Sequence, residues 1–231
     1  MSAAADWVDR TEAALLDAAI ARAPETGWNR LLVKAAGRDR SLSGGDLELL
    51  LPKGAADLAA LLSRRHDAVA LAALAESEAG KLKIRERIFV AVQARLEAAA
   101  ADEGATRRWA AFLASPLNLP LAMRLVWESA DAIWRWAGDT ATDENHYSKR
   151  AILSGILISA LGVRLGQGKE AADAFVSDRI ENVMSFEKWK AGLPKPSERL
   201  REMAEALGRM RYAGLAPGVT APADQEADAA G

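Results

Sequence analysis

The sequence has no cysteine, which excludes disulfides, thiol catalysis and thiolate metal sites. It has only two histidines, His66 and His146, and no pair of Glu-x-x-His motifs of the kind that builds a carboxylate-bridged di-iron bundle. No Gly-x-Ser-x-Gly elbow occurs, and the turn Gly166–Lys169 lacks the following Ser or Thr of a phosphate loop. Because the parts for nucleophilic and metal chemistry are missing, we predict a protein that is not an enzyme and has no cofactor.

A strong charge of one sign is also missing. The net charge of the 231 residues is −2, so no global field draws the protein to nucleic acid or anionic lipid. The apolar run from Ala151 to Val163 is shorter than the ~20 residues of a transmembrane helix, which predicts a buried helix instead. The start, MSAAADWVDR, has no basic or apolar region of a signal peptide. We therefore expect a cytoplasmic protein.

Alanine and leucine dominate the sequence, and half of the residues are hydrophobic. This balance favours helices, and helical periodicity interrupted by Gly and Pro runs through nearly the whole chain. We predict an all-α fold of about ten helices, over residues 9–22, 28–36, 43–51, 55–75, 81–101, 105–114, 119–137, 145–165, 170–190 and 197–212.

Three short helices and then a long one, around the segment SLSGGDLELLLPKGAADLAALL, resemble the helix-turn-helix head of TetR-type regulators. A recognition helix needs Arg, Lys, Asn or Gln for base edges. The third helix here offers Asp46 and Glu48, which a polyanion would repel. We predict a vestigial helix-turn-helix in residues 1–53 that is retained for packing. The alternative is a TetR-type ligand-sensing transcriptional repressor.

The stretch WESADAIWRWAGD, from Trp127 to Asp139, contains three of the seven tryptophans. On a helical wheel Trp127 and Trp134 share one broad apolar face, and Trp136 lies on a ridge nearly opposite. The run after it, from Ala151, mixes large apolar residues with small ones. Small residues allow close packing or leave volume unfilled, so rigid tryptophans facing that helix could frame an apolar ligand cavity. Simple core packing, in a purely structural adaptor, remains the other interpretation.

The run WRWAGDTATDENHYSKRA, from Trp134 to Ala151, resembles the signature of the ubiquinone-biosynthesis accessory proteins, and the resemblance covers about residues 11–190. Members of that family have a TetR-like fold, bind lipids and partner the di-iron demethoxyubiquinone hydroxylase. The resemblance implies a non-enzymatic accessory protein that binds a polyprenyl, isoprenoid or phospholipid ligand. It also implies a homodimer formed by the helices at 145–165 and 170–190. From Asp46 and Glu48 on the third helix, we expect no nucleic-acid binding.

The resemblance, together with the wheel, gives three groups of expected site residues. For lipid binding they are Met123, Trp127, Trp134, Leu153, Ile156, Leu157 and Leu161. For the hydroxylase they are Asp131, Asp143, Asn145, His146 and Tyr147. For peripheral contact with the inner membrane, through an amphipathic helix, they are Leu200, Met203, Leu207 and Met210.

We expect four regions. The head at residues 1–53 precedes a lipid-binding and dimerisation body at 54–193, an amphipathic helix at 194–213 and a disordered tail at 214–231.

Overall fold

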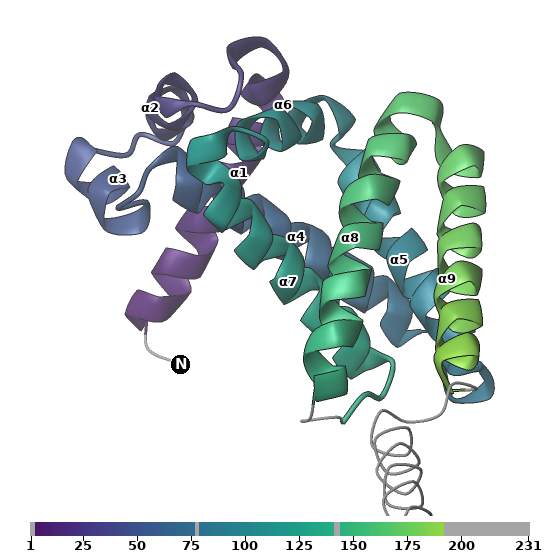
Figure 1. Ribbon diagram of the computed structural model, residues 1–231. Helices are drawn as coiled ribbons and strands as arrows, with labels where there is room; N and C mark the ends of the chain where they lie inside the picture. The colour runs from purple at the N-terminus through teal and green to yellow at the C-terminus, as the bar shows by residue number, and fades with distance from the viewer. Residues whose placement is uncertain (1–2, 77–78, 141–143, 192–231) are drawn as a thin grey trace, which may run out of the picture. The chain divides into compact units, whose positions relative to one another are not determined.

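A computed structural model describes residues 3–76, 79–140 and 144–191. Those residues form helices and no strand, so the all-α prediction is confirmed. The helices are α1 (Ala3–Thr26), α2 (Arg30–Asp39), α3 (Gly44–Leu50), α4 (Ala55–Ala75), α5 (Ile84–Ala101), α6 (Glu103–Leu113), α7 (Leu119–Trp136), α8 (Glu144–Gln167) and α9 (Lys169–Ala191), with short 3₁₀ helices η1 (Ala79–Lys81) and η2 (Pro116–Asn118) (Figure 1). The helix expected at 197–212 lies outside the described residues.

The chain divides into two compact units, Met1–Asn182 and Val183–Gly231. The helices that carry the cavity and the junction discussed below all belong to the first unit. In the part of the chain that is described, no single helix is long and apolar enough to cross a membrane. Only α6 taken together with Pro116–Trp136 reaches that length and composition, and this pair is bent by 90°.

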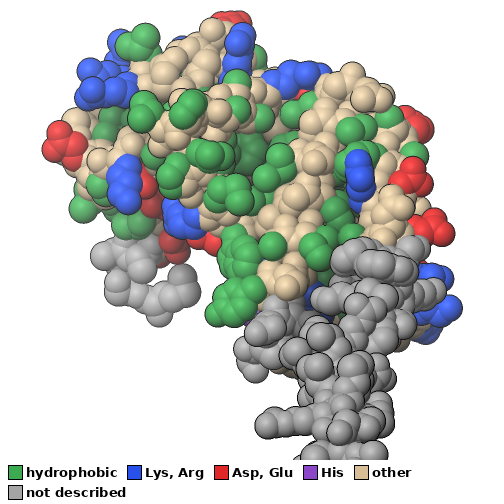
Figure 2. All heavy atoms as spheres, viewed as in Figure 1, with side chains coloured by type: hydrophobic (Ala, Val, Ile, Leu, Met, Phe, Trp, Pro, Cys, Tyr) green, Lys and Arg blue, Asp and Glu red, His purple; other side chains and the backbone are tan. Residues whose placement is uncertain are grey.

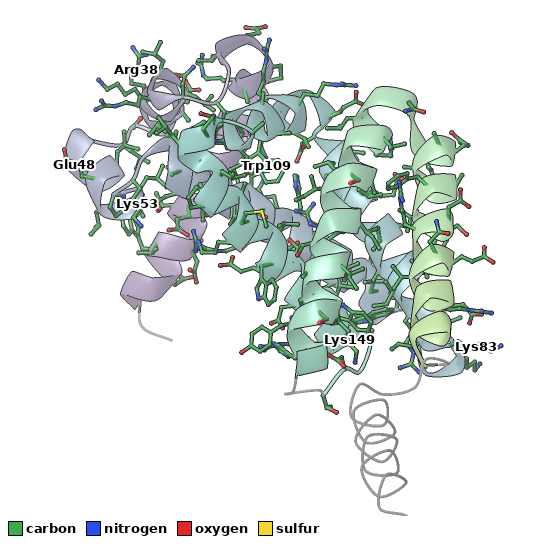
Figure 3. All side chains as sticks on the ribbon, in the orientation of Figure 1. Arg38, Glu48, Lys53, Lys83, Trp109 and Lys149 are labelled. Atoms are coloured by element: carbon green, nitrogen blue, oxygen red, sulfur yellow. The ribbon has the colours of Figure 1, made fainter. Side chains whose placement is uncertain are left out.

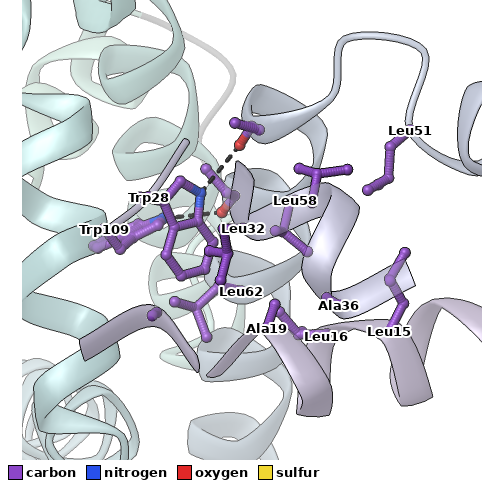
Figure 4. Packing of buried hydrophobic residues seen from close by; sticks show 14 of the residues in the cluster. Leu15, Leu16, Ala19, Trp28, Leu32, Ala36, Leu51, Leu58, Leu62 and Trp109 are labelled. Carbon is purple, nitrogen blue, oxygen red and sulfur yellow. Dashed lines mark hydrogen bonds between the residues drawn. The ribbon is translucent and has the colours of Figure 1, made fainter. Parts of the chain in front are cut away.

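The first hydrophobic core lies among α1, α2, α4 and α6 (Figure 4). Leu15, Leu32 and Leu58 are fully buried there. Two tryptophans join the helices by hydrogen bonds as well as by packing, because Trp28 Nε1 donates to Ala55 O at 3.1 Å and Trp109 Nε1 donates to Ala59 O at 3.0 Å. Each indole thus buries a large apolar surface with its N–H satisfied.

Helices α2 and α3 pack closely at a glycine. A Cβ on Gly37 would lie 2.7 Å from Leu47 Cδ1, so a larger residue would require the Leu47 side chain to move. A capping box begins α3: the Asp46 backbone N–H donates to Ser43 Oγ at 3.1 Å, and the Asp46 carboxylate accepts from Ser43 N at 2.8 Å. Asp46 therefore has a structural role at the start of α3, while Glu48 and Leu49 are exposed on it (Figure 3).

The second hydrophobic core lies among α5, α7, α8 and α9. Helix α7 belongs to both cores, since Leu125 packs in the first and Ala130 and Ile133 pack in the second. Trp134 and Trp136, which lie on nearly opposite ridges of the helical wheel, both pack against the second core. A core that wraps around the end of α7 receives side chains from both ridges of the helix.

Candidate functional site

A cavity of about 280 Å³ lies among α4, α5, α6, α7 and α8. Its lining is almost entirely apolar and includes Trp109 of α6. Figure 3 shows this residue between α2–α3 and α8. Several apolar residues on the same helices are exposed, among them Leu119, Met123 and Ile158, and Figure 2 shows hydrophobic side chains gathered over this face. The cavity is therefore an apolar chamber beside an apolar surface.

Three of the seven expected lipid-binding residues line the cavity: Met123, Leu157 and Leu161. The other four lie outside its lining: Trp127, Trp134, Leu153 and Ile156. From α7 the cavity takes residues between Leu119 and Ser129, and from α8 it takes residues between Leu157 and Leu165. The end of α7 and the start of α8 instead contact each other through Trp134 and Lys149 and through Asp131 and Arg150.

The two tryptophans outside the cavity lining have other contacts. Trp134 Nε1 donates to Lys149 O at 3.1 Å, and the Lys149 ammonium lies 5.3 Å from the centre of the Trp134 ring. The Trp127 ring lies 6.2 Å from that of Tyr147. The wheel placed both indoles on one face of the helix, but it carries no information on how far along the helix the cavity extends.

Three polar residues also line the cavity: Ser63, Arg95 and Ser129, and all three are buried. Arg95 Nε donates to Asp67 Oδ1 at 2.6 Å, and the Ser129 hydroxyl lies 2.7 and 3.0 Å from the two oxygens of the same carboxylate. The sequence analysis missed this group. The one available signal was Arg95 itself, a lone cation within the mostly apolar run from Ile88 to Ala101.

His66 lies behind this wall, with its ring 6.2 Å from that of Trp109 in an edge-to-face arrangement. The side chain is fully buried, and neither ring nitrogen has a hydrogen-bond partner among the described residues. Burial, with smaller contributions from Arg95 and Arg65, lowers the pKa of His66 to about 3. The nearest carboxylate oxygen, on Asp102, is 4.0 Å away, too far for a hydrogen bond, so His66 is neutral at pH 7.

A buried ionic network holds the junction between α7 and α8. Arg150 is only 2 % exposed and donates to Asp131 at 2.6 Å and to Asp139 at 3.1 Å. Lys149 donates to Asp139 at 2.7 Å. Burial acts to raise the pKa of Asp139, but the hydrogen bonds from Lys149 and Arg150 outweigh it and hold the pKa below its usual range. Asp139 is therefore a carboxylate that fixes the start of α8.

A glycine and a distant arginine end α7. Gly138 has φ +92°, in the region that favours glycine, and Asp139 N donates to Trp134 O at 2.9 Å. This is the pattern of a Schellman C-cap. From α5, Arg87 Nη1 donates to Ala137 O at 3.0 Å and satisfies another carbonyl at the helix end. The junction is thus fixed by three helices.

The residues expected to bind the hydroxylase do not all lie at the surface. Tyr147 is 64 % exposed and its ring lies 5.1 Å from that of half-buried His146, so these two and Trp127 form an aromatic patch on the surface. Asp131 is turned inward, to Arg150, and also pairs with Arg135 at 2.8 Å. Asp143 and the side chain of Asn145 lie outside what the structure describes. The four membrane-contact residues, Leu200, Met203, Leu207 and Met210, lie outside it too.

Residues 119–187 match the COQ9 family model. This segment covers α7, α8 and most of α9, and so includes one side of the cavity and the α7 and α8 residues of the junction. Two similar relatives are the mitochondrial ubiquinone biosynthesis proteins COQ9-B of Xenopus laevis and COQ9 of Rattus norvegicus. Each is 27 % identical over 186 residues, or 74 % of this chain, and the matches cover 62 % and 58 % of the relatives.

Over a shorter segment, the sequence identity to a relative is higher. COQ9-A of Xenopus laevis is 34 % identical over 74 residues, which are 31 % of this chain and 23 % of that protein. The chain thus spans less than two thirds of the length of these relatives. Within the described ranges there is also no group of three or more His, Cys, Asp or Glu residues that could hold a metal ion.

Proposed function

We propose that this protein is a non-enzymatic, lipid-binding accessory protein of ubiquinone biosynthesis. It would bind a polyprenylated quinone intermediate and present it to the di-iron demethoxyubiquinone hydroxylase. The observation that carries the proposal is the apolar cavity, one wall of which is built by α7 and α8, the helices that match COQ9. Ubiquinone precursors partition strongly into lipid, so holding one in water needs an apolar container, which gains roughly 0.8 kcal/mol per buried methylene.

The size of the cavity limits how much of such a ligand it encloses. An apolar cavity of ~150 Å³ is enough to hold benzene, so about 280 Å³ accommodates one ring with its substituents, or a short length of chain. A long polyprenyl chain would continue over the exposed apolar side chains of α7 and α8. A homodimer through α8 and α9, and a C-terminal membrane contact, belong to the same proposal and would help to cover that chain.

Blocking the cavity should abolish lipid binding. Gly162 of α8 lines the cavity, and a Cβ added there meets no atom within 4 Å. We expect Gly162→Trp to lower the amount of co-purified lipid at least about tenfold, because the indole fills space that the ligand needs. Native mass spectrometry with lipid identification, on protein expressed in a quinone-producing host, measures this loss.

Gly155→Trp is the matched control. Gly155 lies on the same helix with the same open space around its Cβ, but it does not line the cavity. This variant should retain lipid as the unmodified protein does. Unmodified protein that carries no lipid from such a host would instead favour a structural adaptor with an empty pocket.

The aromatic patch at the start of α8 should contact the hydroxylase. Tyr147→Ala removes its most exposed ring, and we expect at least a tenfold weaker interaction, because exposed aromatic residues are frequent binding hot spots. Binding of the purified hydroxylase, followed by biolayer interferometry, measures this change. Leu49→Ala, an equally exposed apolar position on α3, serves as the control. Equal affinities of the two variants would place the partner elsewhere.

The repressor alternative finds no support. Helix α3 exposes Glu48 and Leu49, and Asp46 is occupied by the capping box. A gel shift with upstream DNA at two salt concentrations tests it directly, since specific binding would be tight and strongly salt-dependent.

A further inference from the structure

The polar residues that line the cavity are all buried. Ser63 of α4, Arg95 of α5 and Ser129 of α7 are each less than 10 % exposed, whereas the lining residues Leu119, Met123 and Ile158 are each about half exposed. The polar groups of the lining therefore lie away from the surface, and the lining that meets the surface is apolar. A lipid bound with its apolar end inward would place hydrocarbon against these polar groups and leave its polar end among exposed apolar residues.

These buried polar groups are together electrically neutral. Arg95 and Asp67 form an ion pair with side chains that are 8 % and 16 % exposed, and Ser129 adds a hydrogen bond to the same carboxylate. The pair uses the Nε–H of Arg95, so the four N–H donors on its Nη atoms are not taken by Asp67. The guanidinium thus provides donors without an excess of positive charge.

Resting on the function proposed above, we propose that the ligand binds with its polar end innermost. We also propose that this end is an uncharged group with acceptor oxygens, such as a carbonyl or an ether. Its oxygens would accept hydrogen bonds from the Arg95 guanidinium and the Ser63 hydroxyl, and its chain would leave past Met123 and Ile158.

The charge balance of the buried groups favours an uncharged polar end of the ligand over an anionic one. Moving a carboxylate or phosphate into a buried site is costly unless a cation compensates it. Arg95 is already neutralised by Asp67, so an anionic head would leave one net negative charge in the cavity. An uncharged acceptor avoids that cost and still receives charge-assisted hydrogen bonds, which are stronger than those between neutral groups.

Three probes that share a benzene ring and a decyl chain test the orientation of the ligand: decylbenzene, 4-decylacetophenone and the 4-decylbenzoate anion. They carry respectively no polar group, an uncharged carbonyl and a carboxylate. We expect the delipidated full-length protein to bind the ketone roughly tenfold more tightly than the hydrocarbon, and more tightly than the carboxylate. Displacement of a fluorescent lipid gives the three dissociation constants at one pH.

The double variant Asp67→Leu with Arg95→Met removes the guanidinium donors, adds no new donor and keeps the site neutral. It should lose most of the preference for the ketone while its affinity for decylbenzene, an internal measure of an intact cavity, stays the same or rises. Ser63→Ala deletes one hydroxyl and should reduce the ketone's advantage about two- to threefold. If the double variant does not fold, the Ser63→Ala variant by itself tests the proposed orientation.

The outcomes separate the two proposals. Equal binding of decylbenzene and decylacetophenone, or a preference that survives both variants, overturns the head-inward orientation and leaves lipid binding standing. Tightest binding of decylbenzoate overturns the uncharged head. If none of the three probes binds, the proposed function fails, and this inference fails with it.

Discussion

The substitution Arg150→Met is expected to lower the free energy of unfolding by about 3 kcal/mol or more. The guanidinium of Arg150 is almost completely buried and bonds to both Asp131 and Asp139. Without it, the Asp139 carboxylate, which is only 6 % exposed, retains Lys149 but loses its buried partner. A buried charge that is no longer fully compensated destabilises the folded state strongly. Urea unfolding followed by circular dichroism measures the change.

An exposed ion pair on the neighbouring helix is the control for Arg150. Arg124 and Glu128 of α7 form an ion pair at 3.2 Å with side chains 53 % and 41 % exposed. Arg124→Met should cost less than about 0.5 kcal/mol, because solvent screens such pairs. A similar, small effect of both substitutions would show that the junction network does not hold α8 in place.

Acidification should destabilise the protein through His66. In the unfolded chain this histidine takes up a proton near pH 6.5, whereas its pKa in the folded state is about 3. The unfolded state therefore binds more protons between these values, and stability falls as the pH decreases from 6.5. The loss is about 1.4 kcal/mol per pH unit, or about 2 kcal/mol between pH 6.5 and pH 5. Urea titrations at several pH values measure the slope.

His66→Leu should remove this pH dependence and raise stability at pH 7 by about 1 kcal/mol or more, because two buried nitrogens without partners disappear. The control is His146→Leu, which removes the other histidine from a half-buried surface position at the start of α8. It should leave the acid sensitivity in place. If His66→Leu keeps the full slope, the sensitivity comes from other groups.

The sequence predicted the helices well, because each one has its own periodicity and its own stop. The predicted ranges agree with α2 to α9 to within a few residues. The largest difference is α1, which was expected over residues 9–22 and instead spans Ala3–Thr26. Pro24 lies in its last turn, where the missing N–H removes one i→i−4 hydrogen bond but leaves little helix beyond it, and the chain turns at Gly27 with φ +76°.

Most of the candidate site depends on contacts between distant residues, which periodicity does not show. Ser63, Arg95 and Ser129 come from three helices and meet only in the fold. In the same way, Asp131 looked like a surface residue on a polar strip, but Arg150 of the next helix turns it into an internal partner. The local sequence pattern predicted part of the apolar lining of the cavity, namely Met123, Leu157 and Leu161. It could not predict the polar residues of the lining.

The position of α7 in both hydrophobic cores has a consequence for how the molecule can evolve. Deleting the segment α1–α3 would uncover the first core, in which Leu125 of α7 and Trp109 of α6 are buried, and both of these residues also line the cavity. The segment α1–α3 therefore supports the residues that form the wall of the cavity. This packing is a physical reason to retain that segment, whatever other role it has.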